Sequence, residues 1–498
     1  MHDTQQPVFE FLASQGRDVK RIDTHAASVF LSGDRALKVK RAVRFTFLDF
    51  STLEKRKAAC DAEIEVNKRY APAIYRGVVT ITREADGTLA IEGDGTPVEY
   101  AVDMARFDET ETLDHLAEQG RIDGRLADRL GIAVAEAHRI APVMRGANFA
   151  ATLDEIIAQN DGELADFPDL FDAGVVKELT AASRAALSRL RLLLDARERD
   201  GCVRRCHGDL HLGNLVLIDN QPMLFDAIEF NDRLAIIDRF YDLAFLLMDL
   251  IERGLAPAAT TVLNRYLTAT NDDRDLDALA LLPLLMSLRA AIRAKVTAAR
   301  PSRDASLDAR ARDYFALAQR LITPPSPQFI AVGGLSGTGK SVLARALSEH
   351  ITPLPGAIWL RSDVIRKQLF GKTETEALPP EAYKPGVTAR VYETLATRAA
   401  RVFAAGHSVI VDAVFARAGE RADIEQAAPN AFRGLFLTAN LDTRLARVGS
   451  RKNDASDADA RIARAQEDYD LGDLSWSKVD ASGTPEETLR NARAALTP

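Results

Sequence analysis

Cysteine is scarce in this sequence. The chain of 498 residues contains only 3 cysteines, Cys60, Cys202 and Cys206, and an odd, sparse set does not form a disulfide framework. Cys202 and Cys206 are spaced as two metal ligands could be, but no second pair completes a zinc site. We therefore expect buried or incidental thiols in a reducing compartment.

Long hydrophobic runs are also missing. The first eleven residues are polar and acidic, without the basic start and apolar core of a signal peptide. The apolar stretches Leu243–Met248 and Ala278–Met286 are too short to cross a bilayer. These absences predict a cytoplasmic protein with no membrane partner.

The sequence has no excess of basic residues. Its formal net charge is −8, which argues against a general nucleic-acid binder because phosphate contacts need a basic surface. Hydrophobic residues make up 47% and charged residues 27%, a soluble globular composition. The length predicts two or three domains.

A proline-rich segment at residues 323–327 marks the clearest boundary. Proline disfavours helix at and before its own position, so this segment is predicted to be a short, stiff linker. It separates predicted domains at residues 1–322 and 328–498.

The first predicted domain begins with short segments that alternate with turns and indicate a small β-rich lobe; mostly helical patterns follow from Leu113. Its expected elements are strands at Val29–Leu31, Leu37–Lys40 and Val78–Thr82, a helix near Leu53–Tyr70, and a hairpin of Leu215–Ile218 with Met223–Phe225.

The second predicted domain opens with a phosphate-binding motif. An apolar run, predicted to be a buried strand, leads into a G-x-x-x-x-G-K-[ST] segment and then an amphipathic helix. The motif comprises Gly334, Leu335, Ser336, Gly337, Thr338, Gly339, Lys340 and Ser341. Its glycines let backbone N–H groups surround a phosphate, Lys340 reaches the β/γ-phosphates, and the Ser341 hydroxyl ligates Mg²⁺.

Three further features narrow this nucleotide site to a kinase. Asp363 stands where a strand enters a helix, and is predicted to accept the proton of an acceptor hydroxyl; capping the helix is the alternative. Asp412 ends an apolar strand and is predicted to hold Mg²⁺ through water. Clustered arginines on one helical face are predicted to close over the transferring phosphoryl group; a solvated basic face is the alternative. They are Arg444, Arg447 and Arg451.

These residues resemble the P-loop small-molecule kinases, such as gluconate kinase, and their relatives the zeta toxins and polynucleotide kinases. The resemblance covers residues 326–498 and implies that Asp363 is the catalytic base or an acceptor ligand. It implies lid positions for the three arginines. The part of those kinases that selects the acceptor has no match here.

A second motif lies in the first domain. Asp209 and Asn214 are five residues apart in the segment His207–Asn214, and Asp226 ends the hairpin that follows. Phosphoryl transfer needs a carboxylate to orient the hydroxyl, and an amide with a second carboxylate to hold Mg²⁺. This spacing provides both.

The second motif resembles the H-x-D-x-x-x-x-N loop of aminoglycoside phosphotransferases and protein kinases. The resemblance implies that Asp209 is the catalytic base and that Asn214 and Asp226 are metal ligands. It implies a structural role for His207 and a buried Asp242 that steadies the loop.

The small lobe supplies the matching lysine. Lys38 lies on a strand that resembles the one whose lysine binds the α/β-phosphates in this family, and Lys40 points to the same face and stays an alternative. The resemblance implies that Glu63 is the ion-pair partner and that Met104–Phe107 is the hinge. No glycine-rich loop follows the first strand, where Thr24–Ser28 stands instead, and this favours the aminoglycoside phosphotransferases over protein kinases.

The sequence thus predicts an α+β two-lobed protein-kinase-like fold followed by an α/β P-loop NTPase with a parallel sheet. The leading hypothesis is an ATP- and Mg²⁺-dependent phosphotransferase with two sites for small hydroxylated acceptors. One alternative is a single catalytic domain joined to a nucleotide-sensing domain, and another is a toxin-like P-loop kinase.

Overall fold

The computed structural model of the chain describes residues 5–45, 48–301, 303–450 and 455–496. The chain forms two compact units, each described by itself below. The first consists of Met1–Ala158 with Arg191–Asp249, and the second of Gln159–Leu190 with Leu250–Pro498. The predicted linker at residues 323–327 therefore lies inside the second unit.

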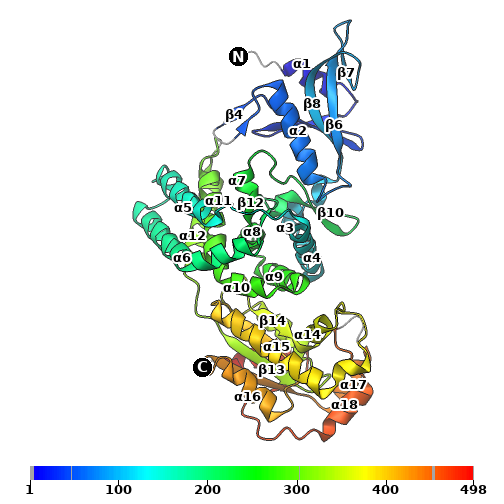
Figure 1. Cartoon of the computed structure of the whole chain (residues 1–498), viewed down its shortest axis with the longest axis vertical. Coiled ribbons are helices and arrows are strands. Elements are labelled where there is room, and N and C mark those ends of the chain that lie inside the picture. The colour runs from blue at the N-terminus through cyan, green and yellow to red at the C-terminus, as the bar shows by residue number, and fades with distance from the viewer. Residues whose placement is uncertain (1–4, 46–47, 302, 451–454, 497–498) are drawn as a thin grey trace. The chain divides into compact units, whose positions relative to one another are not determined.

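The small lobe of the first unit is an antiparallel six-stranded sheet in the order β1-β2-β3-β8-β6-β7 (Figure 1). The strands are β1 (Lys20–Asp23), β2 (Ala27–Ser32), β3 (Arg35–Lys40), β6 (Tyr75–Arg83), β7 (Leu89–Ile91) and β8 (Thr96–Ala105). Helix α1 (Gln6–Ala13) packs Phe9 with Val39 and other apolar residues of the sheet. Side chains alternate along a strand, so Lys38 and Lys40 point to the opposite face from Val39. Helix α2 (Leu53–Asn67) contacts β6 and β8.

The predicted hairpin of the first unit is present. It pairs β10 (Leu215–Ile218) with β11 (Gln221–Leu224), and Asp219 and Asn220 turn the chain with φ of 49° and 63°. Around it lie short helices and strands and one long helix. They are α3 (Leu113–Glu118), α4 (Gly124–Ile140), β9 (Val203–Arg205), α7 (Asp232–Ala235) and β12 (Ile236–Asp238). Helix α8 (Arg239–Glu252) begins in this unit and carries Asp242.

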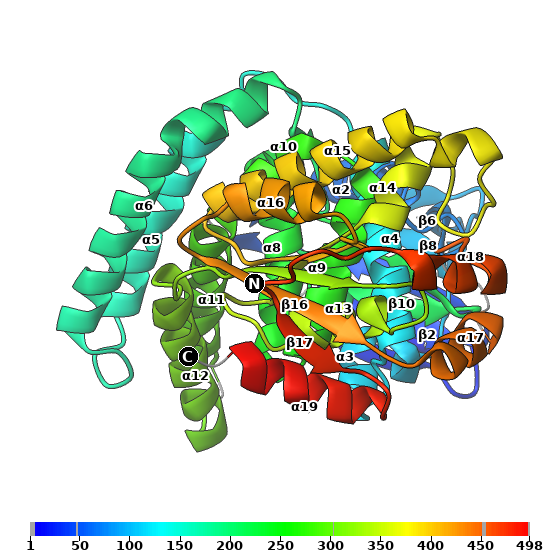
Figure 2. The ribbon, with the colours of Figure 1, turned by 90° about the horizontal axis from the view of Figure 1, so that it is seen from below.

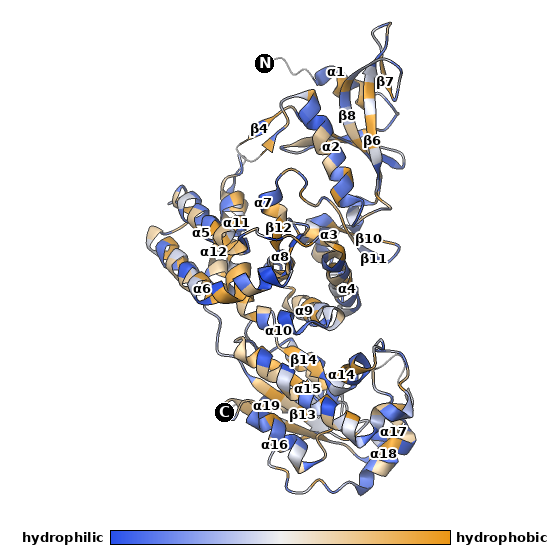
Figure 3. Cartoon of the chain, in the orientation of Figure 1, coloured by the Kyte–Doolittle hydropathy of each residue, from blue (hydrophilic) through white to orange (hydrophobic). Residues whose placement is uncertain are grey.

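The second unit contains a five-stranded parallel sheet in the order β14-β15-β13-β16-β17. Its strands are β13 (Phe329–Gly334), β14 (Ile358–Arg361), β15 (Val409–Asp412), β16 (Phe432–Thr438) and β17 (Ser477–Asp480). Helices α13 (Lys340–Ser348) and α19 (Pro485–Leu496) lie on one side, and α15 (Pro385–Ala404) and α16 (Ala418–Gln426) on the other (Figure 2). Strand β13 is fully buried, as expected for a central parallel strand covered on both faces. Figure 3 shows the strands of this sheet largely in the colour of hydrophobic residues.

Helices N-terminal to the sheet belong to the same unit. They are α9 (Ala256–Thr270), α10 (Asp273–Ala278), α11 (Leu282–Ala298) and α12 (Ala305–Ile322). The Asn264 amide of α9 caps the edge of β14: its Nδ2 donates to Ala357 O at 3.0 Å, and Trp359 N donates to its Oδ1 at 2.7 Å. Arg401 of α15 pairs with Asp277 of α10 at 2.6 Å. The P-loop sheet is thus held by helices that precede residue 323.

Both predicted fold classes are confirmed. The three cysteines are free and buried, which agrees with the expectation of inert thiols. Among the described residues, no helix combines the length and apolar character needed to cross a membrane.

Candidate functional site

The first site centres on two lysines of β3 and one glutamate of α2. Lys38 Nζ donates to Glu63 Oε1 at 2.9 Å and to Asp226 Oδ1 at 2.6 Å. Lys40 Nζ lies 2.5 Å from Glu63 Oε2 and also bonds Glu229. The two lysines named as alternatives therefore share one glutamate, whose side chain is completely buried. The ion pair expected between Lys38 and Glu63 is present.

These contacts set the charge states of the first site. Burial disfavours the charged form of Lys38, but Asp226 and Glu63 outweigh it and hold the lysine pKa well above its ordinary value. Burial likewise raises the pKa of Glu63, but Lys38 and then Lys40 outweigh it, so that the pKa of this carboxyl is lowered. Both shifts favour the charged forms of Lys38 and Glu63, whereas burial raises the pKa of Glu229.

The loop after the hairpin presents Asp226 in an unusual backbone conformation. Asp226 has a φ of 60°, and its N–H donates to Tyr75 Oη at 3.0 Å. The next residue is held from α2, because Asn67 Nδ2 donates to Ala227 O at 3.1 Å and Ala227 N donates to Asn67 Oδ1 at 2.7 Å. A positive φ in a residue other than glycine is strained, and functional sites are where such strain usually persists.

Asp209 and Asn214 lie together, as their spacing predicted. Asn214 Nδ2 donates to Asp209 O at 2.9 Å and to Asp209 Oδ2 at 3.0 Å. His211 Nε2 is 3.4 Å from the same carboxylate oxygen. The Asp209 side chain is 42% exposed, so its carboxylate remains accessible to a substrate hydroxyl.

The buried Asp242 holds the backbone of the segment His207–Asn214. Asp242 is fully buried and accepts backbone hydrogen bonds from His207 N at 3.0 Å and Gly208 N at 2.9 Å. His138 Nε2 lies 3.2 Å from its Oδ2. His207 is buried, its Nε2 donates to Phe225 O at 2.9 Å, and burial lowers its pKa so that the ring is neutral. These positions fit the supporting roles expected of His207 and Asp242.

The second site is built mainly from backbone. The glycine-rich loop joins β13 to α13, and Gly334, Gly337 and Gly339 have φ of 142°, 88° and 92°. A Cβ at Gly337 would lie 2.6 Å from Arg444 O, so only glycine fits there. Ser336 N donates to Gln466 Oε1 at 2.6 Å. The loop can adopt this shape because glycine has no Cβ.

The predicted metal ligands of the second site are adjacent. Ser341 Oγ donates to Asp412 Oδ2 at 2.7 Å, and Arg361 Nε lies 4.0 Å from the same oxygen. Lys340 Nζ donates to Leu335 O at 3.2 Å across the loop. Thr338 is buried, and its hydroxyl closes the loop on Leu335 O at 2.8 Å.

Asp363 lies in the first turn of α14 (Ser362–Leu369). The N-cap of this helix is Arg361, and no side chain caps it, so the alternative of Ser362 or Asp363 as a helix cap is absent. Burial raises the pKa of Asp363, Arg361 opposes that shift, and Asp412 adds to it. A carboxylate with a raised pKa beside a phosphate site suits general-base chemistry.

Two of the arginines predicted to form a lid contact the backbone of the loop. Arg444, on α17 (Leu441–Ser450), is buried, and its Nε donates to Ser336 O at 2.9 Å. Arg447 donates to Thr338 O at 3.4 Å and to Ala481 O at 2.8 Å. In this arrangement both guanidinium groups hold backbone carbonyls. Arg451 lies outside the described residues.

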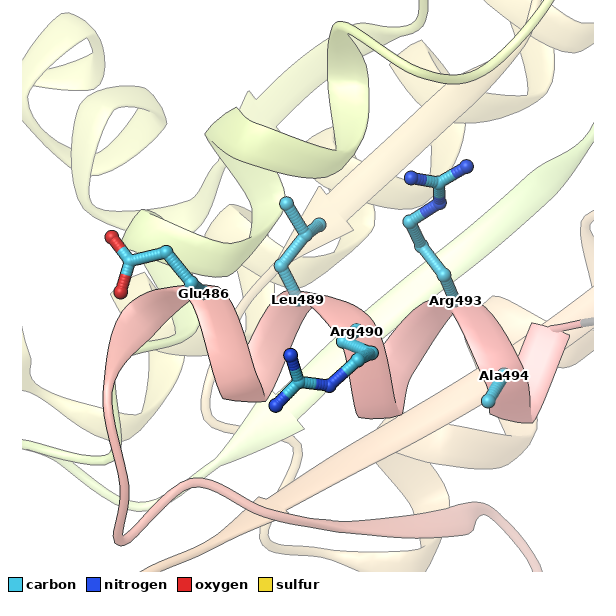
Figure 4. A pocket seen from close by; sticks show the side chains of 5 residues that line it. All are labelled: Glu486, Leu489, Arg490, Arg493 and Ala494. Atoms are coloured by element: carbon cyan, nitrogen blue, oxygen red, sulfur yellow. The ribbon is translucent and has the colours of Figure 1, made fainter.

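A pocket of about 490 Å³ lies along α19 (Figure 4). It is lined by Glu486, Leu489, Arg490, Arg493 and Ala494. None of these five residues belongs to either candidate site, so the pocket is not the predicted place of phosphoryl transfer.

Sequence reasoning missed four supporting residues. Glu229 and Asn67 hold the loop of the first site, Tyr75 receives its backbone N–H, and Gln466 binds the P-loop backbone. None of them belongs to a recognisable motif. Only Glu229, three residues after Asp226, had a local signal: an acidic residue close to a predicted metal ligand.

Two family models match separate parts of the chain, and the first of them extends across both compact units. Residues 39–282 match the family model described as the phosphotransferase enzyme family, and residues 329–470 match the model described as an AAA domain. An uncharacterised protein of Mycobacterium tuberculosis is 29% identical over 489 residues, which cover 94% of each chain.

Among solved structures, a gluconokinase from Sinorhizobium meliloti 1021 is 24% identical and covers 34% of this chain and 91% of its own, with a TM-score of 0.25. A choline/ethanolamine kinase family protein from Mesorhizobium loti is 17% identical and covers 65% and 96%, with a TM-score of 0.39.

The two family matches confirm the predicted resemblance and the prediction of a phosphotransferase, and the alcohol acceptor stays a prediction. Residues 39–282 are similar to the phosphotransferase enzyme family and residues 329–470 to an AAA domain, and the chain is a phosphotransferase.

Proposed function

We propose that this phosphotransferase has two ATP- and Mg²⁺-dependent sites, one in each unit, and that both act on small hydroxylated molecules in the cytoplasm. The observation that carries the proposal is the presence, in one chain, of two complete sets of groups for phosphoryl transfer. Each set joins a lysine, two oxygen ligands for a cation and a separate carboxylate for the acceptor hydroxyl.

In the first site, Asp209 takes the proton of the acceptor hydroxyl, because its carboxylate is exposed and oriented by the Asn214 amide. Asn214 and Asp226 hold Mg²⁺, since amide and carboxylate oxygens are the donors that this cation prefers. Lys38, fixed by Glu63, binds the phosphates. Magnesium, when bound, neutralises charge on the phosphate oxygens.

In the second site, the loop from Gly334 to Ser341 cradles the phosphates with backbone N–H groups. Ser341 and Asp412 fit Mg²⁺, because a hydroxyl and a carboxylate already share a hydrogen bond of 2.7 Å at the loop. Asp363 accepts the proton of the second acceptor. Arg444 and Arg447 keep the cradle in shape through Ser336 O and Thr338 O.

The test is ATP-dependent phosphoryl transfer by the full chain to a panel of sugars, amino alcohols, hydroxy acids and nucleosides. Asp209→Asn and Lys340→Ala should each remove transfer to a different acceptor, and the double variant should remove both. Asp219→Asn, on the exposed hairpin tip, is the matched control. If neither Asp209→Asn nor Lys340→Ala lowers any ATP turnover, the proposal is wrong.

The alternative with one catalytic unit and one nucleotide sensor makes a different prediction. It draws support from the first unit, where Asp226 is bound to Lys38 and no glycine-rich loop precedes β3. In that case Asp209→Asn would leave transfer to every acceptor intact, and Lys38→Ala would change only how the second site responds to ATP concentration.

A further inference from the structure

His211 lies in the middle of the first site, but the proposed chemistry gives it no role. It stands between Asp209 and Asn214 in the sequence, and its side chain is 21% exposed. Its backbone N–H donates to Asp209 O at 3.0 Å, and its backbone carbonyl accepts from Asn214 N at 3.0 Å. The residue is therefore part of the turn that carries the groups assigned to proton transfer and to Mg²⁺.

The ring of His211 is fixed by its surroundings. Its Nδ1 accepts a hydrogen bond from Gly213 N at 3.1 Å, which caps the short 3₁₀ turn η2 (Leu212–Asn214). The ring also packs on Phe245 of α8, with 5.4 Å between the ring centroids. A Cβ at Gly213 would lie 3.0 Å from His211 Cε1, so a side chain there would push the ring away. The free protein therefore holds the imidazole in one orientation.

The hydrogen bond from Gly213 also decides where the ring carries its hydrogen. An imidazole nitrogen that accepts a hydrogen bond has no hydrogen of its own, so Nδ1 is unprotonated and the neutral ring carries its hydrogen on Nε2. This Nε2 lies 3.4 Å from Asp209 Oδ2. The N–H of the ring is therefore next to the carboxylate that is assigned to take the proton of the acceptor.

Two N–H groups meet at the same oxygen of Asp209. Asn214 Nδ2 donates to Oδ2 at 3.0 Å, and His211 Nε2 approaches it to 3.4 Å. The second contact is longer than an ordinary N–H···O hydrogen bond, but contacts of catalytic groups are often long in a free enzyme and shorten when the substrate binds. A carboxylate held at one oxygen by two donors cannot rotate freely, so its other oxygen has a fixed direction.

We propose that His211 is a positioning residue, whose Nε2–H fixes the Asp209 carboxylate in the orientation that receives the proton of the acceptor hydroxyl. In the transfer, the acceptor oxygen bonds to the γ-phosphorus of ATP, the bond from this phosphorus to the leaving ADP oxygen breaks, and Asp209 takes the hydroxyl proton. His211 acts through Asp209 and exchanges no proton with the substrate. The inference rests on the proposed function of the first site and adds a residue to it.

Two substitutions separate the two contacts of the ring. Asparagine can still accept from Gly213 N, as Nδ1 does, but it is too short to reach Asp209. Glutamine is longer and can bring an N–H group to the position of Nε2. His211→Asn should therefore lower kcat by about tenfold and leave KM for ATP unchanged, because the groups that hold the nucleotide stay in place. His211→Gln should retain most of kcat.

The rates are measured on the full chain with Lys340→Ala, so that transfer reports on the first site. The acceptor is whichever member of the panel of sugars, amino alcohols, hydroxy acids and nucleosides supports transfer that depends on Asp209. His115→Asn is the matched control: this half-exposed histidine of α3 bonds Thr112 Oγ1 at 2.7 Å, and its loss should leave kcat unchanged. Thermal unfolding of each variant shows whether a lower kcat comes from a weaker fold.

A spectroscopic measurement tests the geometry without an acceptor. Two-bond ¹⁵N–¹H correlation spectra of the full chain, labelled in histidine, report which ring nitrogen carries hydrogen. The signals that disappear in His211→Asn belong to His211, and they should show an unprotonated Nδ1 and a protonated Nε2.

The outcomes that overturn the inference are distinct from those that overturn the function. If His211→Asn keeps the kcat of the background, if His211→Gln is as slow as His211→Asn, or if the spectra show the hydrogen on Nδ1, His211 does not position Asp209. A Lys340→Ala background without transfer that depends on Asp209 contradicts the proposed function of the first site instead. The spectra then decide by themselves whether the ring carries its hydrogen on the nitrogen beside Asp209.

Discussion

The two proposed phosphate sites differ in the groups that would bind the phosphate. Under the proposed function, the first binds phosphate through side-chain charges, with Lys38 and Lys40 arranged around the buried Glu63. The second relies on backbone N–H groups of a glycine-rich loop, supported by side chains that bind its carbonyls, such as Arg444 on Ser336 O. A charged network tolerates changes in backbone shape but not in charge, whereas a backbone cradle tolerates no added Cβ.

The largest effect is expected from replacing a phosphate-binding lysine, and it is tested by comparing Lys340→Ala with Lys38→Ala. Lys340→Ala should lower ATP-dependent transfer by the second site by roughly 10²–10³, as expected when a direct electrostatic stabiliser is removed. Lys38→Ala should leave a clear residual activity, because Lys40 remains bonded to the same glutamate. Rates of ADP formation by the two single variants decide the matter, and a larger loss with Lys38→Ala would reverse this ranking of the sites.

As the pH is lowered, the second unit should lose stability at a higher pH than the ion pairs of Lys38, Lys40 and Glu63 in the first unit. His407 is buried with its Nε2 bonded to Gly356 O at 2.8 Å, and burial lowers its pKa from 6.5 to about 4. Its folded pKa is depressed, so its contribution to stability is complete above pH 6.5 and is lost as the pH falls towards 4. Complete loss amounts to about 3 kcal/mol.

Unfolding of the full chain by urea across this pH range measures the effect. His407→Gln should flatten the pH dependence of the second unit's transition, whereas His25→Gln, at an exposed position, should leave it unchanged. Glu63 also has a lowered pKa, so its stabilising charge is lost only as the pH falls through a value below 4.5. If the His407→Gln protein loses stability with pH as steeply as the parent protein, His407 is not the cause of the acid sensitivity.

Adding one methyl group to the glycine-rich loop should weaken nucleotide binding at the second site. Gly337→Ala places a Cβ 2.6 Å from Arg444 O at a φ of 88°, which should cost about 1–3 kcal/mol and weaken nucleotide binding to the second unit. Gly419→Ala, in α16 where a Cβ meets nothing within 4 Å, is the matched control and should be neutral or stabilising. Analogue binding with a Lys38→Ala background reports the change.

The last comparison concerns the edge of the P-loop sheet. Asn264→Ala should destabilise the second unit by about 1–3 kcal/mol, because Ala357 O and Trp359 N lose their partner. Asn264→Asp keeps one acceptor and should cost less at Trp359. For the same reason a fragment of residues 328–498 should unfold at a lower temperature than one of residues 250–498. Equal melting temperatures would show that the helices before residue 323 do not stabilise the sheet.

Several elements could be predicted because their information is local. The strand, glycine-rich loop and helix around Lys340 occupy consecutive positions, and the hairpin at Asp219 and Asn220 follows from its turn residues. The lid role of Arg444 and Arg447 is implied by the resemblance to P-loop kinases, and helical spacing added that they share one face. That spacing placed them on one face, but it could not say that the face packs against the P-loop.

By itself, the sequence determined the two motif sets, the fold of each half and the residues that carry charge at each site. It did so because phosphate binding needs particular residue types at short, fixed spacings. Only the tertiary structure decided that Lys40 shares Glu63 with Lys38, that Glu229 completes the network, and that Asn264 closes the sheet edge. These partners are distant in sequence, and a contact between distant residues is decided by how whole elements pack, which no local pattern encodes.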